Sequence, residues 1–227
     1  MTVARQSHRA TLLNDGRVVV IGGLDISYVS TNTIEIFDPG LNTWTTQTPI
    51  NIARQNHTIE ILQNGKILII GGYSSLYLMS VELYDVGLNT VTTQNQLIEE
   101  KYLQTATLLP NGKVLTVGGR NTVSMNLTSV QLYNPATNSW TDKAPLTSGR
   151  NSHTATLLPN GKVLIVGGEG ASSSVELYDP VTDSWTTESS LNHGRYNHTA
   201  TLLSNGKVLV VGGYGCSGYC DSVEVYD

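Results

Sequence analysis

Residues 150–168 have the sequence Arg150-Asn-Ser-His153-Thr-Ala-Thr-Leu-Leu-Pro-Asn160-Gly161-Lys-Val-Leu-Ile-Val-Gly167-Gly168. This stretch predicts one β-hairpin, with a first strand from His153 to Leu158 and a second from Val163 to Val166. Asn160-Gly161 is the strongest short signal for a hairpin, because a two-residue type I′ turn needs a positive φ at both central residues. The stretch decides the fold because the chain contains five versions of it.

The five versions recur at intervals of 45 to 49 residues, which is the mark of an internal repeat. Their Gly-Gly pairs begin at Gly22, Gly71, Gly118, Gly167 and Gly212. A third strand is predicted after each pair, at 33–37, 80–84, 129–133, 174–178 and 222–226. A fourth strand is centred on Trp44, Val91, Trp140 and Trp185. One sheet of four short strands cannot bury both of its faces, whereas sheets stacked around an axis can, so the repeat predicts a β-propeller.

The period, the Gly-Gly pairs, the Tyr that ends strand three and the Trp that follows it resemble the kelch repeat over essentially the whole chain. The resemblance implies an all-β propeller of five four-stranded blades that form a single domain over residues 1–227. The blades are expected at about 1–49, 50–96, 97–145, 146–190 and 191–227. The sequence departs from the pattern at Phe37, Val91, Lys101 and Gln104, where the other repeats have Tyr, Trp, Arg and His.

The ends of the chain leave two arrangements open. The last repeat stops at strand three, so its blade is expected to lack the outer strand. The chain then forms either a five-bladed ring with a three-stranded last blade, or a piece of a larger propeller or of a longer protein. We favour a five-bladed arrangement that is incomplete relative to something longer.

Composition narrows the classes of partner. A net charge of −5 over 227 residues gives no basic surface for nucleic acid. The longest apolar runs, such as 67–70, are far too short to cross a bilayer, so no membrane insertion is expected. We expect a monomer without a cofactor.

Two sets of polar residues recur in the predicted inner and third strands. The first is an Arg-x-x-His motif whose imidazoles are His8, His57, His153 and His198. Its functional interpretation is a ring of imidazoles in the central channel that holds a metal or an anion; we favour the alternative that each His satisfies backbone groups of its own or a neighbouring blade. The second set consists of the strand-three residues Glu35, Glu82, Gln131, Glu176 and Glu224, which we expect to pair with the Arg or Lys of the same repeat.

Variation between the repeats is concentrated in the loops after Gly-Gly, and loops on a rigid scaffold are where function usually lies. In kelch proteins these loops share a face with the segments that lead into strand one, so the resemblance implies a ligand-binding face. Tyr and Arg are favoured contact residues at such surfaces. The predicted face contains Tyr28, Tyr73, Tyr77, Tyr102, Arg120, Asn151, Tyr196, Tyr214 and Tyr219. Its ligand is expected to be a protein, a peptide or a glycan.

The two cysteines of the chain, Cys216 and Cys220, both lie in the fifth of these loops. Gly218 allows a tight loop between them, so a local disulfide is predicted, with a pair of reduced thiols as the alternative. A disulfide implies an oxidising compartment and favours an extracellular location.

Two classes of function stay open. The favoured one is a non-catalytic binding module. The alternative is a catalytic propeller, because some kelch-type proteins are copper oxidases similar to galactose oxidase or iron-dependent specifier proteins. The oxidases need a Tyr–Cys cross-link and further ligands, and the sequence contains no such set, so no enzyme is predicted.

Overall fold

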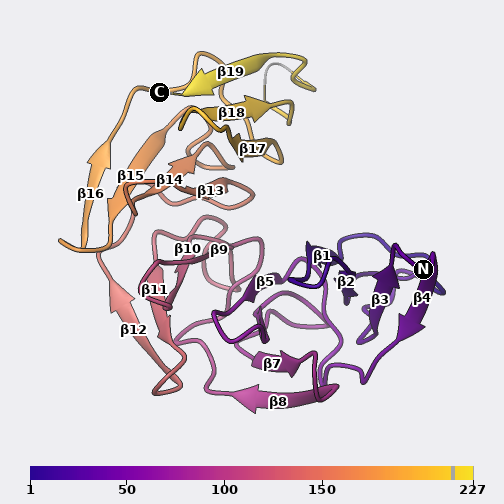
Figure 1. The fold of residues 1–227 in the computed structure, drawn as a ribbon. Helices are drawn as coiled ribbons and strands as arrows, with labels where there is room; N and C mark the ends of the chain where they lie inside the picture. Colours follow the sequence, from indigo (N-terminus) through magenta and orange to yellow (C-terminus); the bar gives the residue numbers. More distant parts are fainter. Residues whose placement is uncertain (216–217, 227) are drawn as a thin grey trace. The chain divides into compact units, whose positions relative to one another are not determined.

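The computed structural model describes residues 1–215 and 218–226 (Figure 1). Within these residues every regular element is a β-strand, and no helix is long and apolar enough to span a membrane. The chain divides into two compact units, Met1–Tyr102 and Leu103–Asp227. The assignment of both units to a single domain stays a prediction.

The first unit contains two four-stranded sheets, called blades 1 and 2. Blade 1 consists of β1 (Arg9–Leu12), β2 (Val18–Ile21), β3 (Ile34–Asp38) and β4 (Thr43–Thr46). Blade 2 consists of β5 (Thr58–Ile61), β6 (Ile67–Ile70), β7 (Val81–Asp85) and β8 (Thr90–Gln94). In both blades each strand pairs antiparallel with the next strand along the chain.

The second unit contains blades 3, 4 and 5. Blade 3 consists of β9 (Thr105–Leu108), β10 (Val114–Val117), β11 (Val130–Asn134) and β12 (Ser139–Lys143). Blade 4 consists of β13 (Thr154–Leu157), β14 (Val163–Val166), β15 (Val175–Asp179) and β16 (Ser184–Thr187). Blade 5 has three described strands, β17 (Thr199–Leu202), β18 (Val208–Val211) and β19 (Val223–Tyr226). The predicted fold class is therefore confirmed: five antiparallel blades, the last with three strands.

The hairpin turn differs from the predicted type. In blade 4, Gly161 N–H donates to Leu158 O at 2.9 Å and Leu158 N–H donates to Lys162 O at 2.8 Å, so the loop has three residues. Only Gly161 has a positive φ, at 81°. The prediction of a two-residue type I′ turn was wrong because the hairpin closes at Leu158 and Lys162, which leaves a three-residue loop with one left-handed glycine at its end. Blades 1, 2 and 5 form the same loop without a proline.

In blades 1, 3 and 4 the first glycine of the Gly-Gly pair lies where no side chain fits. Gly167 has a φ of +59°, and a Cβ built on it would lie 2.5 Å from the backbone oxygen of Arg195 in the next blade. Gly168 N–H donates to that same oxygen at 2.9 Å. The Gly-Gly pair of blade 4 therefore ends strand two in a conformation that favours glycine and packs closely on the next blade.

The core of each unit lies between neighbouring blades. The second strand of most blades is fully buried, as in Val163–Val166. In the second unit one apolar cluster joins blades 3 and 4 and another joins blades 4 and 5. Tyr178 is buried in the first of these and contacts Trp185 with ring centroids 4.8 Å apart. Because the second strand is buried in most blades, each sheet needs a neighbouring sheet to cover it.

Candidate functional site

The arginine of the Arg-x-x-His motif ties the strands of its own blade together. Arg150 is fully buried, and its Nη1 donates to the backbone oxygens of Gly167 at 3.0 Å and Ser174 at 3.1 Å. Its Nη2 donates to Ser174 Oγ at 2.9 Å and to the buried carboxylate of Glu176. The segment before strand one is therefore fixed to the end of strand two and to strand three.

The same ion pair occurs in three other blades. The Nη2-to-carboxylate distances are 2.6 Å for Arg5–Glu35, 2.6 Å for Arg54–Glu82 and 2.7 Å for Arg195–Glu224. These pairs confirm the expected partnership of the strand-three acid with the arginine of its own repeat.

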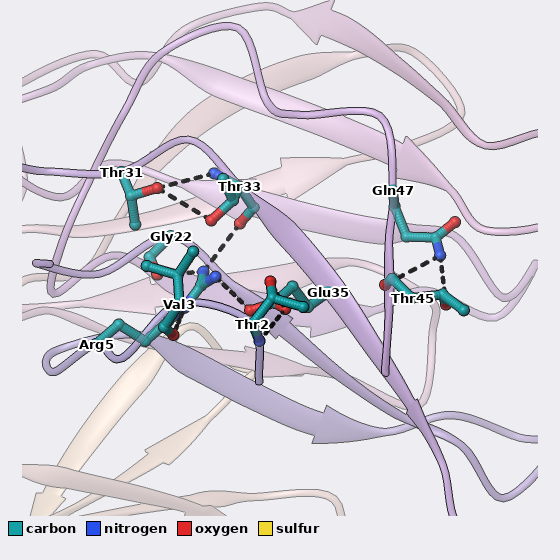
Figure 2. Close-up of polar contacts among 9 residues, drawn as sticks. All are labelled: Thr2, Val3, Arg5, Gly22, Thr31, Thr33, Glu35, Thr45 and Gln47. Carbon is teal, nitrogen blue, oxygen red and sulfur yellow. Dashed lines mark hydrogen bonds and ion pairs between the residues drawn. The ribbon is translucent and has the colours of Figure 1, made fainter. Parts of the chain in front are cut away.

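Figure 2 shows the pair of blade 1, where Arg5 contacts Glu35 and also donates to the backbone oxygens of Gly22 at 3.1 Å and Thr33 at 3.3 Å. Thr2 N–H donates to the other side of the carboxylate at 2.7 Å. Burial acts to raise the pKa of Glu35, but the hydrogen bonds of Thr2 and the charge of Arg5 outweigh it and lower that pKa. The carboxylate is thus held ionised, with its oxygens engaged in structure.

Repeat three replaces both members of the pair. Lys101 is buried, with its Nζ 3.4 Å from Glu99 Oε1. Gln131 is also buried, and its Nε2 donates to Asp142 Oδ1 at 3.2 Å. The arginine and the strand-three acid are therefore replaced together in this repeat, the first by another buried cation and the second by a neutral amide.

The histidines of the second unit bind the preceding blade. His153 Nε2 lies 2.9 Å from Thr105 Oγ1 of blade 3, and His198 Nε2 lies 2.9 Å from Thr154 Oγ1 of blade 4. The hydroxyl comes in each case from the first residue of the preceding blade's first strand. These contacts support a structural role for His153 and His198 between neighbouring blades, but the partner is a threonine hydroxyl and not the expected backbone group.

His57 in the first unit has a different environment. Arg9 stands where the second unit has the threonine, and it donates from Nε to the backbone oxygen of His57 at 2.7 Å. Neither ring nitrogen of His57 has a hydrogen-bond partner, and the side chain is fully buried. Burial first, then the charges of Arg54 and Arg9, lower the pKa of His57 well below its ordinary value, so the ring is neutral.

The four histidines of the predicted channel ring are divided between the two units. His8 and His57 belong to the first unit, and His153 and His198 belong to the second. Within the described residues, no group of three or more His, Cys, Asp or Glu side chains is arranged to hold a metal ion. The ring therefore stays a prediction.

Stability is expected to fall in acid because of His198. Burial first, then Arg195, lower its pKa to about 4, so the folded state favours the neutral ring. The stabilisation is complete above the unfolded pKa of about 6.5 and is lost as the pH falls from there through 4. When the pH is lowered from about 7.5 to about 4.5, the unfolding free energy of the His198→Gln variant should fall by about 2 kcal/mol less than that of the parent protein. Urea titrations at the two pH values measure both falls. Gln104 holds this place in repeat three; equal pH dependence in the two proteins would contradict the assignment.

In blades 1, 2, 4 and 5 the predicted loop face is assembled from two segments. Isolated antiparallel bridges join the residue after Arg in the leading segment to the residue after Gly-Gly. The bridged pairs are Gln6–Leu24, Gln55–Tyr73, Asn151–Glu169 and Tyr196–Tyr214. The loops after Gly-Gly and the leading segments therefore lie side by side in these blades.

Three tyrosines of the first unit form one cluster. Tyr73, Tyr77 and Tyr102 contact one another edge to face, with ring centroids 5.4 to 5.7 Å apart. Each ring is half-buried, and Asn56 Nδ2 donates to Tyr102 Oη at 3.0 Å. We call Tyr73, Tyr77 and Tyr102 the first tyrosine cluster.

The second unit contains a second tyrosine cluster, which consists of Tyr196, Tyr214 and Tyr219. Tyr214 lies 5.4 Å from Tyr196 and 5.5 Å from Tyr219 between ring centroids. The rings become more accessible along the cluster, since Tyr214 is 43% exposed and Tyr219 is 91% exposed. Burial, then Tyr214 and the carboxylate of Glu169, raise the pKa of Tyr196, so an acidic group adjoins the aromatic surface.

The remaining residues of the predicted face have three different environments. Tyr28 is 77% exposed in the loop of blade 1. Arg120 is half-buried and contacts Met125 Sδ at 3.4 Å through Nη2. Asn151 is fully buried, and its Nδ2 donates to Met125 O at 3.0 Å and to Glu169 Oε2 at 3.2 Å. Asn151 therefore supports the loops and has no surface to offer a ligand.

Sequence reasoning missed two residues next to the tyrosines: Asn56, which donates to Tyr102, and Glu169, whose charge acts on Tyr196. The residue type is the one sequence signal for Asn56, because Asn tolerates a left-handed backbone and Asn56 has a φ of 45°. The predicted disulfide includes Cys216, which lies outside the described residues; Cys220 is buried. The disulfide stays a prediction.

Comparison with models of protein families gives a match over most of the chain. The family model described as Attractin/LZTR1 beta-propeller matches residues 1–220. Among curated proteins, none matches the chain.

Proposed function

The chain belongs to the Attractin/LZTR1 beta-propeller family, and on that basis we propose that it is a non-catalytic binding module whose loop face takes a protein, peptide or glycan ligand. Such propellers are in general interaction domains. The proposal assigns binding to the two tyrosine clusters and to Tyr28.

The single observation that carries the proposal is the exposed second tyrosine cluster. Tyr214 and Tyr219 present large aromatic surface on a loop whose base is fixed by the Tyr196–Tyr214 bridge. Tyrosine supplies large contact area at a low cost in side-chain entropy, together with a hydroxyl for hydrogen bonds. The repeated arginines and their glutamates, by contrast, are engaged with one another inside blades 1, 2, 4 and 5.

The chemistry of the surface fits each of the three ligand classes. Aromatic rings accept the apolar faces of sugars and the side chains of peptides, and the nearby Glu169 offers a carboxylate acceptor. A first screen therefore presents the 227-residue chain with a glycan array and with a phage-displayed peptide library.

Loss of the second tyrosine cluster is expected to abolish most of the binding found in that screen. The double variant Tyr214→Ala, Tyr219→Ala should weaken the Kd of a selected ligand by about thirtyfold, the effect of removing one strong contact residue of about 2 kcal/mol. The matched control is Val181→Ser, because Val181 is 92% exposed in the turn between β15 and β16, away from the loop face. A ligand that binds the double variant as tightly as the parent protein would contradict the assignment of this cluster.

A further inference from the structure

An acidic side chain lies at one end of the second tyrosine cluster, at the junction of blades 4 and 5. Gly168 N–H of blade 4 donates to the backbone oxygen of Arg195 of blade 5 at 2.9 Å. The residues that follow these two in the chain, Glu169 and Tyr196, are therefore neighbours across the junction. The charge of Glu169 acts on the Tyr196 hydroxyl and contributes, after burial and Tyr214, to its raised pKa.

The first tyrosine cluster contains the same junction with an aromatic residue in place of the acid. There Gly72 N–H donates to Lys101 O at 2.8 Å. The residues that follow, Tyr73 and Tyr102, contact each other with ring centroids 5.7 Å apart. Blade 4 therefore has a carboxylate at the place from which blade 2 presents a ring to the next leading segment.

Three hydrogen bonds fix Glu169 to the leading segment of its own blade. Glu169 N–H donates to Asn151 O at 2.9 Å, and Asn151 N–H donates to Glu169 O at 3.3 Å. The buried side chain of Asn151 also donates from Nδ2 to Glu169 Oε2 at 3.2 Å. The carboxylate is therefore held in place beside the tyrosines by the fold itself.

Glu169 has no cationic partner in the described part of the second unit. The ion pairs there are Lys143–Asp183, Arg150–Glu176, Lys162–Asp179, His193–Glu224 and Arg195–Glu224. Glu169 is half-buried, and a carboxylate that is partly removed from water without a counter-charge attracts a cation from a ligand.

The tyrosines supply the second part of a cation site. The rings of Tyr196 and Tyr214 lie 5.4 Å apart between centroids, and Tyr214 is 43% exposed. A cation within about 6 Å of a tyrosine centroid is attracted by the face of the ring. A guanidinium suits both parts, because it is planar, stacks on aromatic rings and donates two parallel hydrogen bonds to one carboxylate.

We propose that Glu169 and the second tyrosine cluster bind an arginine side chain of a partner polypeptide, with the guanidinium stacked on Tyr196 and paired with the Glu169 carboxylate. This assignment rests on the binding function proposed above and narrows its ligand to a polypeptide, because a neutral or acidic glycan offers no cation to the carboxylate. The net charge of −5 acts in the same direction, since it favours the approach of cationic partners.

The test uses three phage-displayed libraries of heptapeptides, whose central residue is fixed as arginine, lysine or glutamine and whose other residues are random. Selection on the 227-residue chain is expected to enrich the arginine library at least about tenfold over the glutamine library. Equal enrichment of the glutamine library would overturn the cation site. Equal enrichment of the lysine library would overturn the choice of a guanidinium.

A neutral analogue of the strongest peptide then measures the effect of the charge. Citrulline in place of arginine keeps the shape and removes the charge, so it should weaken the Kd for the parent protein at least about tenfold. The Glu169→Gln variant keeps an oxygen acceptor for Asn151 and should bind the arginine and citrulline peptides within about twofold of each other. A tenfold preference for arginine that survives in this variant would overturn the role of Glu169.

The matched control for the variant is Asp142→Asn, which removes the same charge from an exposed place in β12 and keeps an acceptor for Gln131 Nε2. It should leave the preference for arginine unchanged; its loss would assign the preference to net charge and overturn the site. If Glu169→Gln does not fold, Tyr196→Leu replaces it and should weaken binding of the arginine peptide at least about fivefold. Full binding by a folded Tyr196→Leu would also overturn the proposal.

Failure of the arginine site can be distinguished from failure of the binding function. Peptides or glycans that require Tyr214 and Tyr219 but show no preference for arginine would overturn the arginine site alone. If none of the peptides or glycans binds the chain, both proposals fall.

Discussion

Replacement of Glu176 by leucine is expected to lower the free energy of unfolding by about 3–5 kcal/mol, the cost of leaving one partner of a buried ion pair alone. Glu176 and Arg150 are both fully buried. Arg150 also donates to the backbone oxygens of Gly167 and Ser174. If its side chain moved out of the interior, both oxygens would lose a hydrogen-bond donor. Glu176→Leu therefore leaves a buried charge that is fixed in place. Urea unfolding followed by circular dichroism measures the loss.

A surface ion pair of the same blade is the matched control. Lys162 Nζ lies 3.2 Å from Asp179 Oδ2, and both side chains are partly exposed. Exposed pairs contribute about 0–1 kcal/mol, so Asp179→Leu should cost far less than Glu176→Leu. Similar losses in the two variants would show that the buried pair does not hold the blade together.

The second large effect is expected for Gly167→Ala, at about 4 kcal/mol, from backbone strain and overpacking together. The added Cβ would lie 2.5 Å from the backbone oxygen of Arg195 and 3.0 Å from the ring of His198. Both atoms belong to the next blade, so relief of the clash requires blades 4 and 5 to move apart. The variant should therefore unfold at much lower urea concentration than the parent.

The control for this substitution lies in the same hairpin. Gly161 also has a positive φ, +81°, but a Cβ there would have only Pro110 nearby, at 4.0 Å. Gly161→Ala should therefore cost only the 1–2 kcal/mol or so of a left-handed alanine. If both glycine variants lost the same amount of unfolding free energy, the close approach of Gly167 to blade 5 would not contribute to stability.

Much of the fold was predictable because each blade repeats the same short sequence features. The Gly-Gly pairs, the turn residues and the alternating third strands place all the described strands within a residue or two. The pairing of Arg150 with Glu176 was also predictable, since Lys101 and Gln131 depart from the pattern in the same repeat. The turn type was not, because an Asn-Gly pair is compatible both with a two-residue type I′ loop and with the three-residue loop that ends at Gly161.

The contacts between segments were less predictable than the segments themselves. The His198–Thr154 contact depends on the register between two blades, for which no residue of either strand is a signal. Asn151 is buried because the loop of the preceding blade, through Met125, covers it. The tyrosine clusters depend on the conformation of loops whose lengths differ between repeats, so their composition indicated a binding face without indicating which rings meet.

If the repeated Arg–Glu pairs stabilise the blades and the loop tyrosines serve binding, the two kinds of residue should differ sharply in their effect on stability. The most direct test measures the unfolding free energies of Glu176→Leu and Tyr219→Ala side by side in urea. We expect a loss of about 3–5 kcal/mol for the first and less than about 0.5 kcal/mol for the second, because Tyr219 is 91% exposed. A large loss for Tyr219→Ala together with a small one for Glu176→Leu would contradict this expectation.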